Sequence, residues 1–348
     1  MLIPVQSISR YLDPVHKLTH LSPYTFLRPL NMAPSHNVLT GLAFVSAAVI
    51  FSVRAGAMSI RNQMDERNIH NNYACRSITH PNPVVLLHGL GATFYEDLNV
   101  LEIYLQSQGY CTFSQTYGDY PAFPFVGGLQ PIDSSAAEIE AFINLVHSRT
   151  GAAKVDLIGH SEGGFLALYV PKFTGIARIL DKLVAIAPPT HGTTFAGLYN
   201  LAYVGGNSTR DLFSTVLDTV GCAACDDIGI GGSAVARLND GKPIVQPSNS
   251  LTIIMSKFDE LVTPTTTAFV EEQGVNNLYI QEFCPLDPVG HIGEAYDTNV
   301  WNLVVNALDS TPHRTFTCSF GSPGRWKPGR AGRVDSGLLG RRKTNLFC

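Results

Sequence analysis

Charged side chains are scarce in this chain of 348 residues, in which Asp, Glu, Lys and Arg make up 15%. The 24 basic residues are outnumbered by 28 acidic ones, and the formal net charge is −4. Without an excess of positive charge the chain lacks the electrostatic pattern of a nucleic-acid-binding protein, so no nucleic-acid partner is expected. Hydrophobic residues reach 45%, which fits an enzyme that works near lipid and equally fits any large core.

A zinc-type set of cysteines is also missing. The chain has seven cysteines and one C-x-x-C sequence, Cys222-Ala223-Ala224-Cys225. One such pair without a second is poor evidence for zinc, and a short-span disulfide is the preferred interpretation; reduced thiols in a cytosolic chain are the alternative. No internal repeat is evident, and neither a metal nor a cofactor is expected.

An apolar run without charge covers residues 38–53, and no Lys or Arg lies between Met32 and this run. Taken from Met32, the pattern nevertheless predicts a secretory signal with small residues at a cleavage site that ends at Ala57. Residues 1–57 would then be an N-terminal extension plus signal. An uncleaved signal anchor that tethers the chain to a membrane is the alternative, because the run approaches the ~18 residues of a membrane span.

The most informative motif is Gly159-His160-Ser161-Glu162-Gly163. It follows a strand-like run at 155–158 and precedes a helical pattern at 164–169. G-x-S-x-G between a strand and a helix predicts a nucleophile elbow, a turn so tight that Gly159 and Gly163 must lack side chains. The turn would raise the Ser161 hydroxyl above the edge of a sheet.

Further candidates follow in the chain order that a serine esterase requires. His88-Gly89-Leu90-Gly91 ends a buried strand, and the N–H groups of Leu90 and Glu162 would form an oxyanion hole; an ordinary strand-to-helix turn is the plainer interpretation. Asp259 follows the strand pattern at 251–255 and is the predicted acid, although it could simply cap a turn before Pro264. His291, in a Gly-flanked loop after the last strand, is the predicted base.

Other residues of the same types fit these roles less well. Glu260 is adjacent to Asp259, and Asp240 and Asp287 are weaker substitutes for the acid. His191 precedes the acid, and His313 follows the last helix. Chain order and context, rather than residue type, therefore select His291 among eleven histidines.

Alternating patterns predict an α/β fold with a mostly parallel sheet flanked by helices. The expected strands are at 83–88, 111–117, 154–159, 182–187, 251–256 and 277–283, and the expected helices at 95–108, 134–149, 161–173 and 296–308. The segment 195–241 breaks this alternation and is a candidate cap or lid. The aromatic loop 120–128 is a second candidate, either lining an acyl pocket or packed on the core.

The last segment, 320–348, is rich in Gly and basic residues and has few apolar groups to bury. Its composition predicts a disordered tail, and contact with an anionic membrane surface is the alternative. The hydrolase domain is accordingly placed at 58–319. Asn207-Ser208-Thr209 is a glycosylation sequon, usable only in a eukaryotic secretory path.

These segments resemble the class 2 triacylglycerol lipases, an extracellular lipase and esterase family, and more distantly yeast lipase B. The matching segments are 75–89, 109–111, 154–161, 183–194, 259–264 and 284–297. The resemblance implies the α/β-hydrolase fold, with Ser161 as nucleophile, Asp259 as acid, His291 as base, and Leu90 and Glu162 as oxyanion donors. One departure is Glu162, where the family usually has Gln.

The resemblance also implies three disulfides, which pair Cys75 with Cys111, Cys222 with Cys225, and Cys284 with Cys318. Cys348 is left over. It further implies a secreted, monomeric serine hydrolase that cleaves acyl or lipid esters, at a lipid interface or in solution. A polyester depolymerase or acyltransferase with the same triad, and a noncatalytic binding protein with this fold, are the alternatives.

Overall fold

The computed structural model describes residues 70–194 and 219–320. The predicted signal at 38–53, the sequon at Asn207, much of the cap candidate, Cys348 and almost all of the basic tail lie outside these ranges. No helix of the described ranges combines the length and apolarity needed to cross a membrane.

A six-stranded sheet forms the centre of the described part of the chain, in the order β2-β1-β3-β4-β5-β6. Its strands are β1 (Val84–Leu87), β2 (Thr112–Ser114), β3 (Val155–His160), β4 (Leu180–Ile186), β5 (Ser250–Met255) and β6 (Asn276–Tyr279). Every neighbouring pair is parallel. Since β1, β3 and most of β4 and β5 are buried, they form near-continuous apolar runs.

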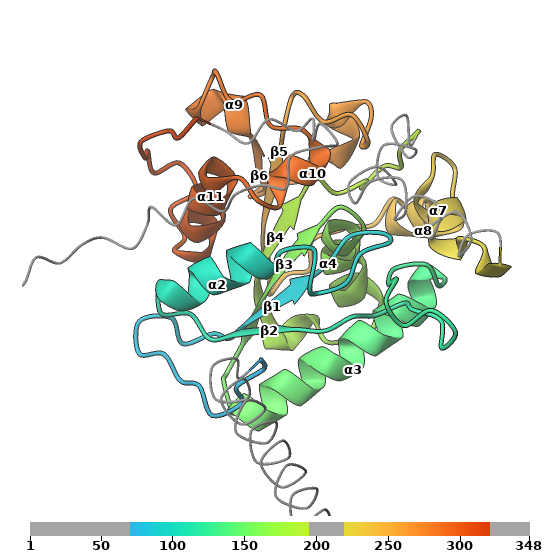
Figure 1. The fold of residues 1–348 in the computed structure, drawn as a ribbon, viewed down its shortest axis with the longest axis horizontal. Coiled ribbons are helices and arrows are strands. Elements are labelled where there is room, and N and C mark those ends of the chain that lie inside the picture. The colour runs from blue at the N-terminus through green and yellow to red at the C-terminus, as the bar shows by residue number, and fades with distance from the viewer. Residues whose placement is uncertain (1–69, 195–218, 321–348) are drawn as a thin grey trace, which may run out of the picture. The chain divides into compact units, whose positions relative to one another are not determined.

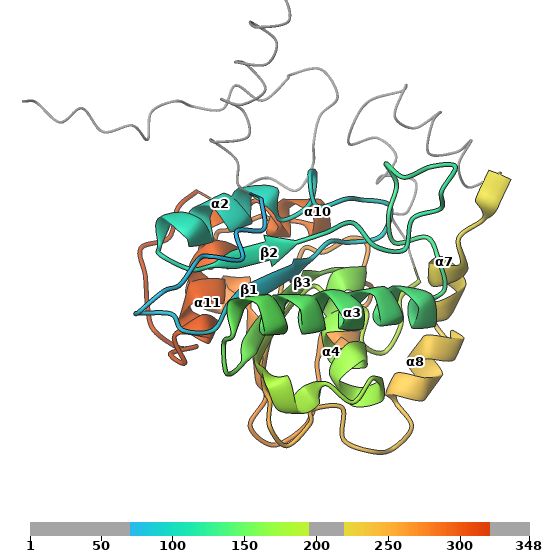
Figure 2. The same ribbon diagram turned by 90° about the horizontal axis from the view of Figure 1, so that it is seen from below.

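Helices cover both faces of this sheet, as Figures 1 and 2 show. On one face lie α2 (Asn99–Ser107) and α11 (Thr298–Leu308), and on the other α3 (Ile132–Thr150) and α4 (Glu162–Phe173). The shorter helices are α7 (Ala223–Ile228), α8 (Ser233–Leu238), α9 (Ile280–Phe283) and α10 (His291–Glu294), with 3-10 turns at Ala177–Ile179 and Thr265–Ala268. The predicted α/β architecture is confirmed.

Four predicted elements differ clearly in their boundaries. The strand predicted at 111–117 covers only Thr112–Ser114. The strand predicted at 277–283 ends at Tyr279 and becomes α9, where the Gln281 side chain donates to Ser256 Oγ and to the Asp287 carbonyl. The helix predicted from residue 296 begins at Thr298, because the Asp297 carboxylate caps its free N–H groups. The helix predicted from residue 95 begins at Asn99, because Leu98 before it has a left-handed backbone with φ 64°.

Parallel strands end at one edge of the sheet, and this arrangement places the candidate residues. The loops that carry His88, Ser161 and Asp259 follow directly after β1, β3 and β5, and His291 follows β6 through α9. Their side chains thus approach one another although they are distant in sequence.

Candidate active site

Ser161 occupies the sharp turn between β3 and α4, with φ 55° and ψ −120°. Its N–H donates to the Ile186 carbonyl at 2.9 Å, which fixes this strained backbone against β4. A Cβ at position 159 would lie 2.0 Å from the Gly163 oxygen, and one at position 163 would lie 2.1 Å from the Leu87 oxygen. Glycine is therefore required on both sides of Ser161, for the reason that the motif predicts.

Ser161, His291 and Asp259 form one hydrogen-bonded series. Ser161 Oγ lies 2.9 Å from His291 Nε2, and His291 Nδ1 lies 2.6 Å from Asp259 Oδ2. An ionised carboxylate only accepts hydrogen bonds, so Nδ1 carries the proton and Nε2 is left to accept from the serine hydroxyl. The structure thus brings together the three residues predicted as nucleophile, base and acid.

The Asp259 carboxylate is buried and fully hydrogen-bonded. Oδ1 accepts from the N–H groups of Leu261 at 2.7 Å and Val262 at 2.8 Å. Burial alone would raise the pKa of Asp259, but attraction to His291 and these hydrogen bonds outweigh it and lower the pKa below its ordinary value. The carboxylate is therefore ionised at neutral pH and holds the ring of His291.

The alternative acids and bases have other partners. Glu260 accepts from the backbone N–H of His291 at 3.1 Å rather than from its ring. Asp287 accepts from Val289 N and Asn299 Nδ2, and Asp240 pairs with Lys172. His191 is exposed and its ring contacts the Phe269 carbonyl, while His313 is exposed near the end of the described chain.

Glu294 is a buried acid that sequence reasoning missed. It lies three residues after His291 on the short helix α10, and Oε1 accepts from Ser256 N at 3.3 Å. Burial, reinforced by the nearby charge of Asp259, raises its pKa well above the ordinary value. Burial therefore favours the protonated form of Glu294, and the spacing of a carboxyl one helical turn after the histidine could have indicated this residue.

The loop after β1 lies beside Ser161. Gly91 N donates to the Gly127 carbonyl and Gly127 N to the Ala92 carbonyl, both at 3.0 Å. Within residues 70–194 and 219–320, neither Leu90 N–H nor Glu162 N–H donates a hydrogen bond to a protein group. Both predicted oxyanion donors are thus available, the second at the N-terminus of α4.

His88 supports this loop as a neutral imidazole. Its ring stacks on Tyr117 with centroids 4.0 Å apart, Nε2 accepts from Tyr117 N at 3.2 Å, and Nδ1 lies 2.9 Å from the Gly89 oxygen. A ring with one donor contact and one acceptor contact is satisfied without charge. Burial also lowers its pKa.

The Glu162 side chain is completely buried, at 0% exposure. Neither carboxyl oxygen has a hydrogen-bond partner among the described residues. The side chain reaches Gly128, where an added Cβ would lie 2.4 Å from Oε2 and 3.2 Å from Leu90 Cα. Burial, with a smaller contribution from the charge of Asp227, raises the pKa of Glu162 well above its ordinary value. A carboxyl that is buried without a hydrogen-bond partner is more costly as a charged group than as a neutral one, so this environment favours the protonated form of Glu162.

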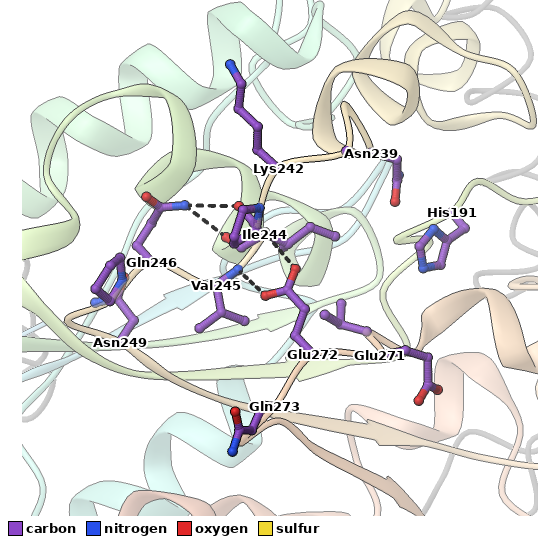
Figure 3. Close-up of a pocket in the computed structure, with 14 residues that line it drawn as sticks. His191, Asn239, Lys242, Ile244, Val245, Gln246, Asn249, Glu271, Glu272 and Gln273 are labelled. Carbon is purple, nitrogen blue, oxygen red and sulfur yellow. Dashed lines mark hydrogen bonds between the residues drawn. The ribbon is translucent and has the colours of Figure 1, made fainter.

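A separate cavity of about 830 Å³ lies away from these residues (Figure 3). His191, Lys242, Gln246 and Glu271 are among its lining residues, and Glu272 bonds the Ile244 and Val245 N–H groups there. Part of its wall precedes β5 and β6, at the amino ends of these strands. His191, by contrast, follows β4, and none of Ser161, Asp259 and His291 lines this cavity.

Three disulfides are present in the described ranges, in the pairs that the resemblance implied. Cys222–Cys225 lies at the start of α7, in the part of the cap candidate that the structure describes. This part packs on the loop before α3 through Ala224 N to the Leu129 oxygen and through Asp227 to Ile132 N. In the aromatic loop, Val126 is buried while Phe125 is half-exposed, so the loop packs on the core in part, and its lining of an acyl pocket stays a prediction.

Comparison with known proteins shows similarity to a family of sequences. A family model described as lipase (class 2) matches residues 81–299. Triacylglycerol lipases of Pseudarthrobacter phenanthrenivorans and Burkholderia plantarii are each 31% identical over 117 residues, which is 33% of this chain. The matched region spans only about a third of those relatives, 35% and 31% of their lengths.

A solved structure supports the fold. The crystal structure of Aspergillus fumigatus lipase B superposes with a TM-score of 0.51 at 20% sequence identity, covering 74% of this chain and 57% of that one. The predicted α/β-hydrolase fold is confirmed.

Proposed function

The chain belongs to the class 2 lipase family, and on that premise we propose that it hydrolyses carboxylic esters through Ser161, His291 and Asp259. The observation that carries this proposal is the continuous hydrogen-bonded series from Ser161 Oγ through the His291 ring to Asp259. Each contact has the geometry and the protonation that nucleophilic catalysis needs before substrate binds.

The proposed reaction proceeds in two halves. His291 Nε2 takes the proton of Ser161 Oγ as the oxygen attacks the ester carbonyl, and Asp259 stabilises the imidazolium that forms. The imidazolium then gives this proton to the departing alcohol, which leaves an acyl group on Ser161. Water activated by His291 cleaves the acyl-enzyme in the same way and regenerates the serine.

Two backbone donors would stabilise the negative oxygen of each tetrahedral intermediate. Leu90 N–H and Glu162 N–H have no competing protein acceptor among the described residues, and the helix dipole of α4 adds to the second. Loss of one such donor typically costs about 3–4 kcal/mol of transition-state stabilisation. The burial of Glu162 favours its protonated form, which does not oppose this charge.

Exposed apolar side chains support a lipid or acyl ester as the substrate. Large ones that are exposed in the segments between the strands or after β6 include Tyr95, Phe125, Ile230, Phe258 and Leu286. Exposed apolar surface is typical of proteins that contact lipid when it forms a contiguous patch. We therefore include binding at a lipid interface in the proposal, with residues 195–241 as a cap over the site.

Export of the chain is part of the same proposal. The described part of the chain has three disulfides. Disulfides form and persist in oxidising compartments and are rare in the cytosol, so these bonds agree with the predicted secretory signal. We propose a secreted, monomeric enzyme, with a signal anchor at 38–53 as the alternative.

The test is hydrolysis of p-nitrophenyl esters from acetyl to palmitoyl by the full chain, beside Ser161→Ala. We expect turnover that Ser161→Ala abolishes while circular dichroism stays unchanged. The dependence on acyl length separates an esterase from a lipase, and assays with a polyester film and with an alcohol acceptor identify a depolymerase or acyltransferase. A folded wild-type protein without turnover would instead favour the noncatalytic alternative.

A further inference from the structure

A second buried acid–histidine pair, Asp97 and His160, lies behind the candidate active site. Asp97 is 8% exposed and His160 is 3% exposed. His160 Nδ1 lies 3.0 Å from Asp97 Oδ2 and 3.1 Å from Oδ1. Its other ring nitrogen, Nε2, lies 3.0 Å from the backbone oxygen of His291.

The partners of His160 define its charge. A carboxylate and a carbonyl oxygen both accept hydrogen bonds, so the ring satisfies both only if each nitrogen carries a proton. His160 is therefore an imidazolium paired with an ionised Asp97. Burial opposes this state, but the Asp97 carboxylate and the His291 carbonyl outweigh it and raise the pKa of His160. The same pairing lowers the pKa of Asp97 against its own burial.

This pair connects the loop after β1 to the segment that carries His291, and the proposed reaction depends on the relative positions of the two. Asp97 Oδ2 accepts from Gly89 N at 2.6 Å, directly before the predicted oxyanion donor Leu90. His160 precedes Ser161 and holds the backbone of His291. Hydrogen bonds therefore connect Gly89 in the oxyanion loop, through the ion pair, to the backbone of His291.

We propose that Asp97 and His160 are positioning residues, an ion pair that fixes the oxyanion loop and the catalytic histidine relative to Ser161. The inference rests on the proposed function. Neither side chain bonds the Ser161 hydroxyl or the His291 ring, so the pair acts through Gly89 and through the His291 backbone. Displacement of a reacting group by about 1 Å can lower a rate by on the order of 10²-fold.

The charged and titratable neighbours of the pair come from several loops. Asp259 and His291 face His160, and the rings of His160 and His291 are 4.9 Å apart between centroids. Asp97 also has His88 and Tyr296 within electrostatic reach. Asp97 is the neighbour that bonds His160 directly as an ion, so its removal should release the extra proton.

The first test needs no variant of the pair. In full-length protein labelled with ¹⁵N-histidine, long-range ¹H–¹⁵N spectra at pH 8.5 should show one histidine with both ring nitrogens protonated. An ordinary histidine, with a pKa near 6.5, is neutral there. The signal should persist in His291→Ala, which excludes the catalytic histidine as its source. Absence of a doubly protonated histidine would overturn the proposal, whether or not the protein hydrolyses esters.

The second test separates positioning from stability. Asp97→Leu with His160→Phe removes both charges, and such apolar replacement of a buried ion pair often restores stability that a single substitution loses. The double variant should still lose on the order of 10²-fold in kcat with KM little changed. Recovery of wild-type kcat together with stability would show a merely structural pair.

His191→Phe is the matched control. The His191 ring also contacts a backbone carbonyl, that of Phe269 at 2.9 Å, but this contact involves neither Ser161 nor the backbone of His291. It should keep wild-type kcat; an equal loss in this variant would refute positioning by the pair. If wild-type protein has no esterase activity, the proposed function fails by itself, and the spectra still decide the charge state of His160.

Discussion

Replacement of Glu162 by Gln tests the inference that this buried carboxyl is protonated at neutral pH. The two side chains are nearly isosteric, and the Glu162 N–H that would stabilise the oxyanion belongs to the backbone. With no charge to remove at pH 7, Glu162→Gln should change kcat by less than about threefold, which corresponds to under ~0.7 kcal/mol.

The burial of Glu162 should also make the free energy of unfolding depend on pH. The pKa of Glu162 is raised on folding from its ordinary value of 4.5. Below that value both folded and unfolded chains hold the proton, and Glu162 has no pH-dependent effect. As pH rises further, the unfolded chain releases the proton while the folded chain keeps it. Wild-type stability therefore falls by about 1.4 kcal/mol per pH unit until the raised pKa is reached.

The measurement is urea unfolding of wild type and Glu162→Gln at half-unit steps from pH 5 to pH 8, with disulfides intact. Other titrating groups are the same in both chains, so their contributions cancel in the difference. The free energy of unfolding of Glu162→Gln, relative to wild type, should rise by about 1.4 kcal/mol per pH unit. A difference that stays constant across this range would show that Glu162 is already ionised and would refute our account of its burial.

Three further predictions concern the elbow, the acid and the disulfides. Gly163→Ala places a Cβ 2.1 Å from the Leu87 oxygen and should lower the free energy of unfolding by more than about 3 kcal/mol in urea titrations; a loss under 1 kcal/mol would contradict the geometry. Asp259→Asn should lower kcat by on the order of 10⁴-fold, whereas the control Glu260→Gln should cost far less, and similar losses would undo the acid assignment. Cys75→Ser with Cys111→Ser opens a link of sequence separation 36 and should cost about 4 kcal/mol of stability in denaturant; an unchanged midpoint would count against it.

Much of the fold could be predicted because β1, β3, β4 and β5 are short, mostly apolar runs followed by recognisable turns. The elbow was the clearest case, since only glycine fits beside Gly163 O and Leu87 O. Predictions of element ends were less accurate where a side chain changes the backbone, as Asp297 does at the start of α11 and Gln281 does after β6. Such contacts depend on residues that are distant in sequence.

The buried polar groups around the site could not be predicted for the same reason. Asp97 lies in an unremarkable loop, and its link to His160 exists only because β1 and β3 are neighbours in the sheet. The departure at Glu162 was visible in the sequence, but its charge state depends on burial. The sequence therefore indicated the elbow and the three proposed catalytic residues, while the partners and burial that govern the charges of Asp97, His160 and Glu162 come only from the structure.

The spread of the site along the chain has a consequence for biosynthesis. Gly89, Ser161, Asp259 and His291 come from four strand-to-helix connections, and Cys284–Cys318 closes a loop around the last of them. Contacts of such long sequence separation form late in folding. A nascent chain that has not yet extended past His291 lacks one of the three proposed catalytic residues. Under the proposed mechanism, the polypeptide is therefore inactive towards esters until synthesis has passed the last of these connections.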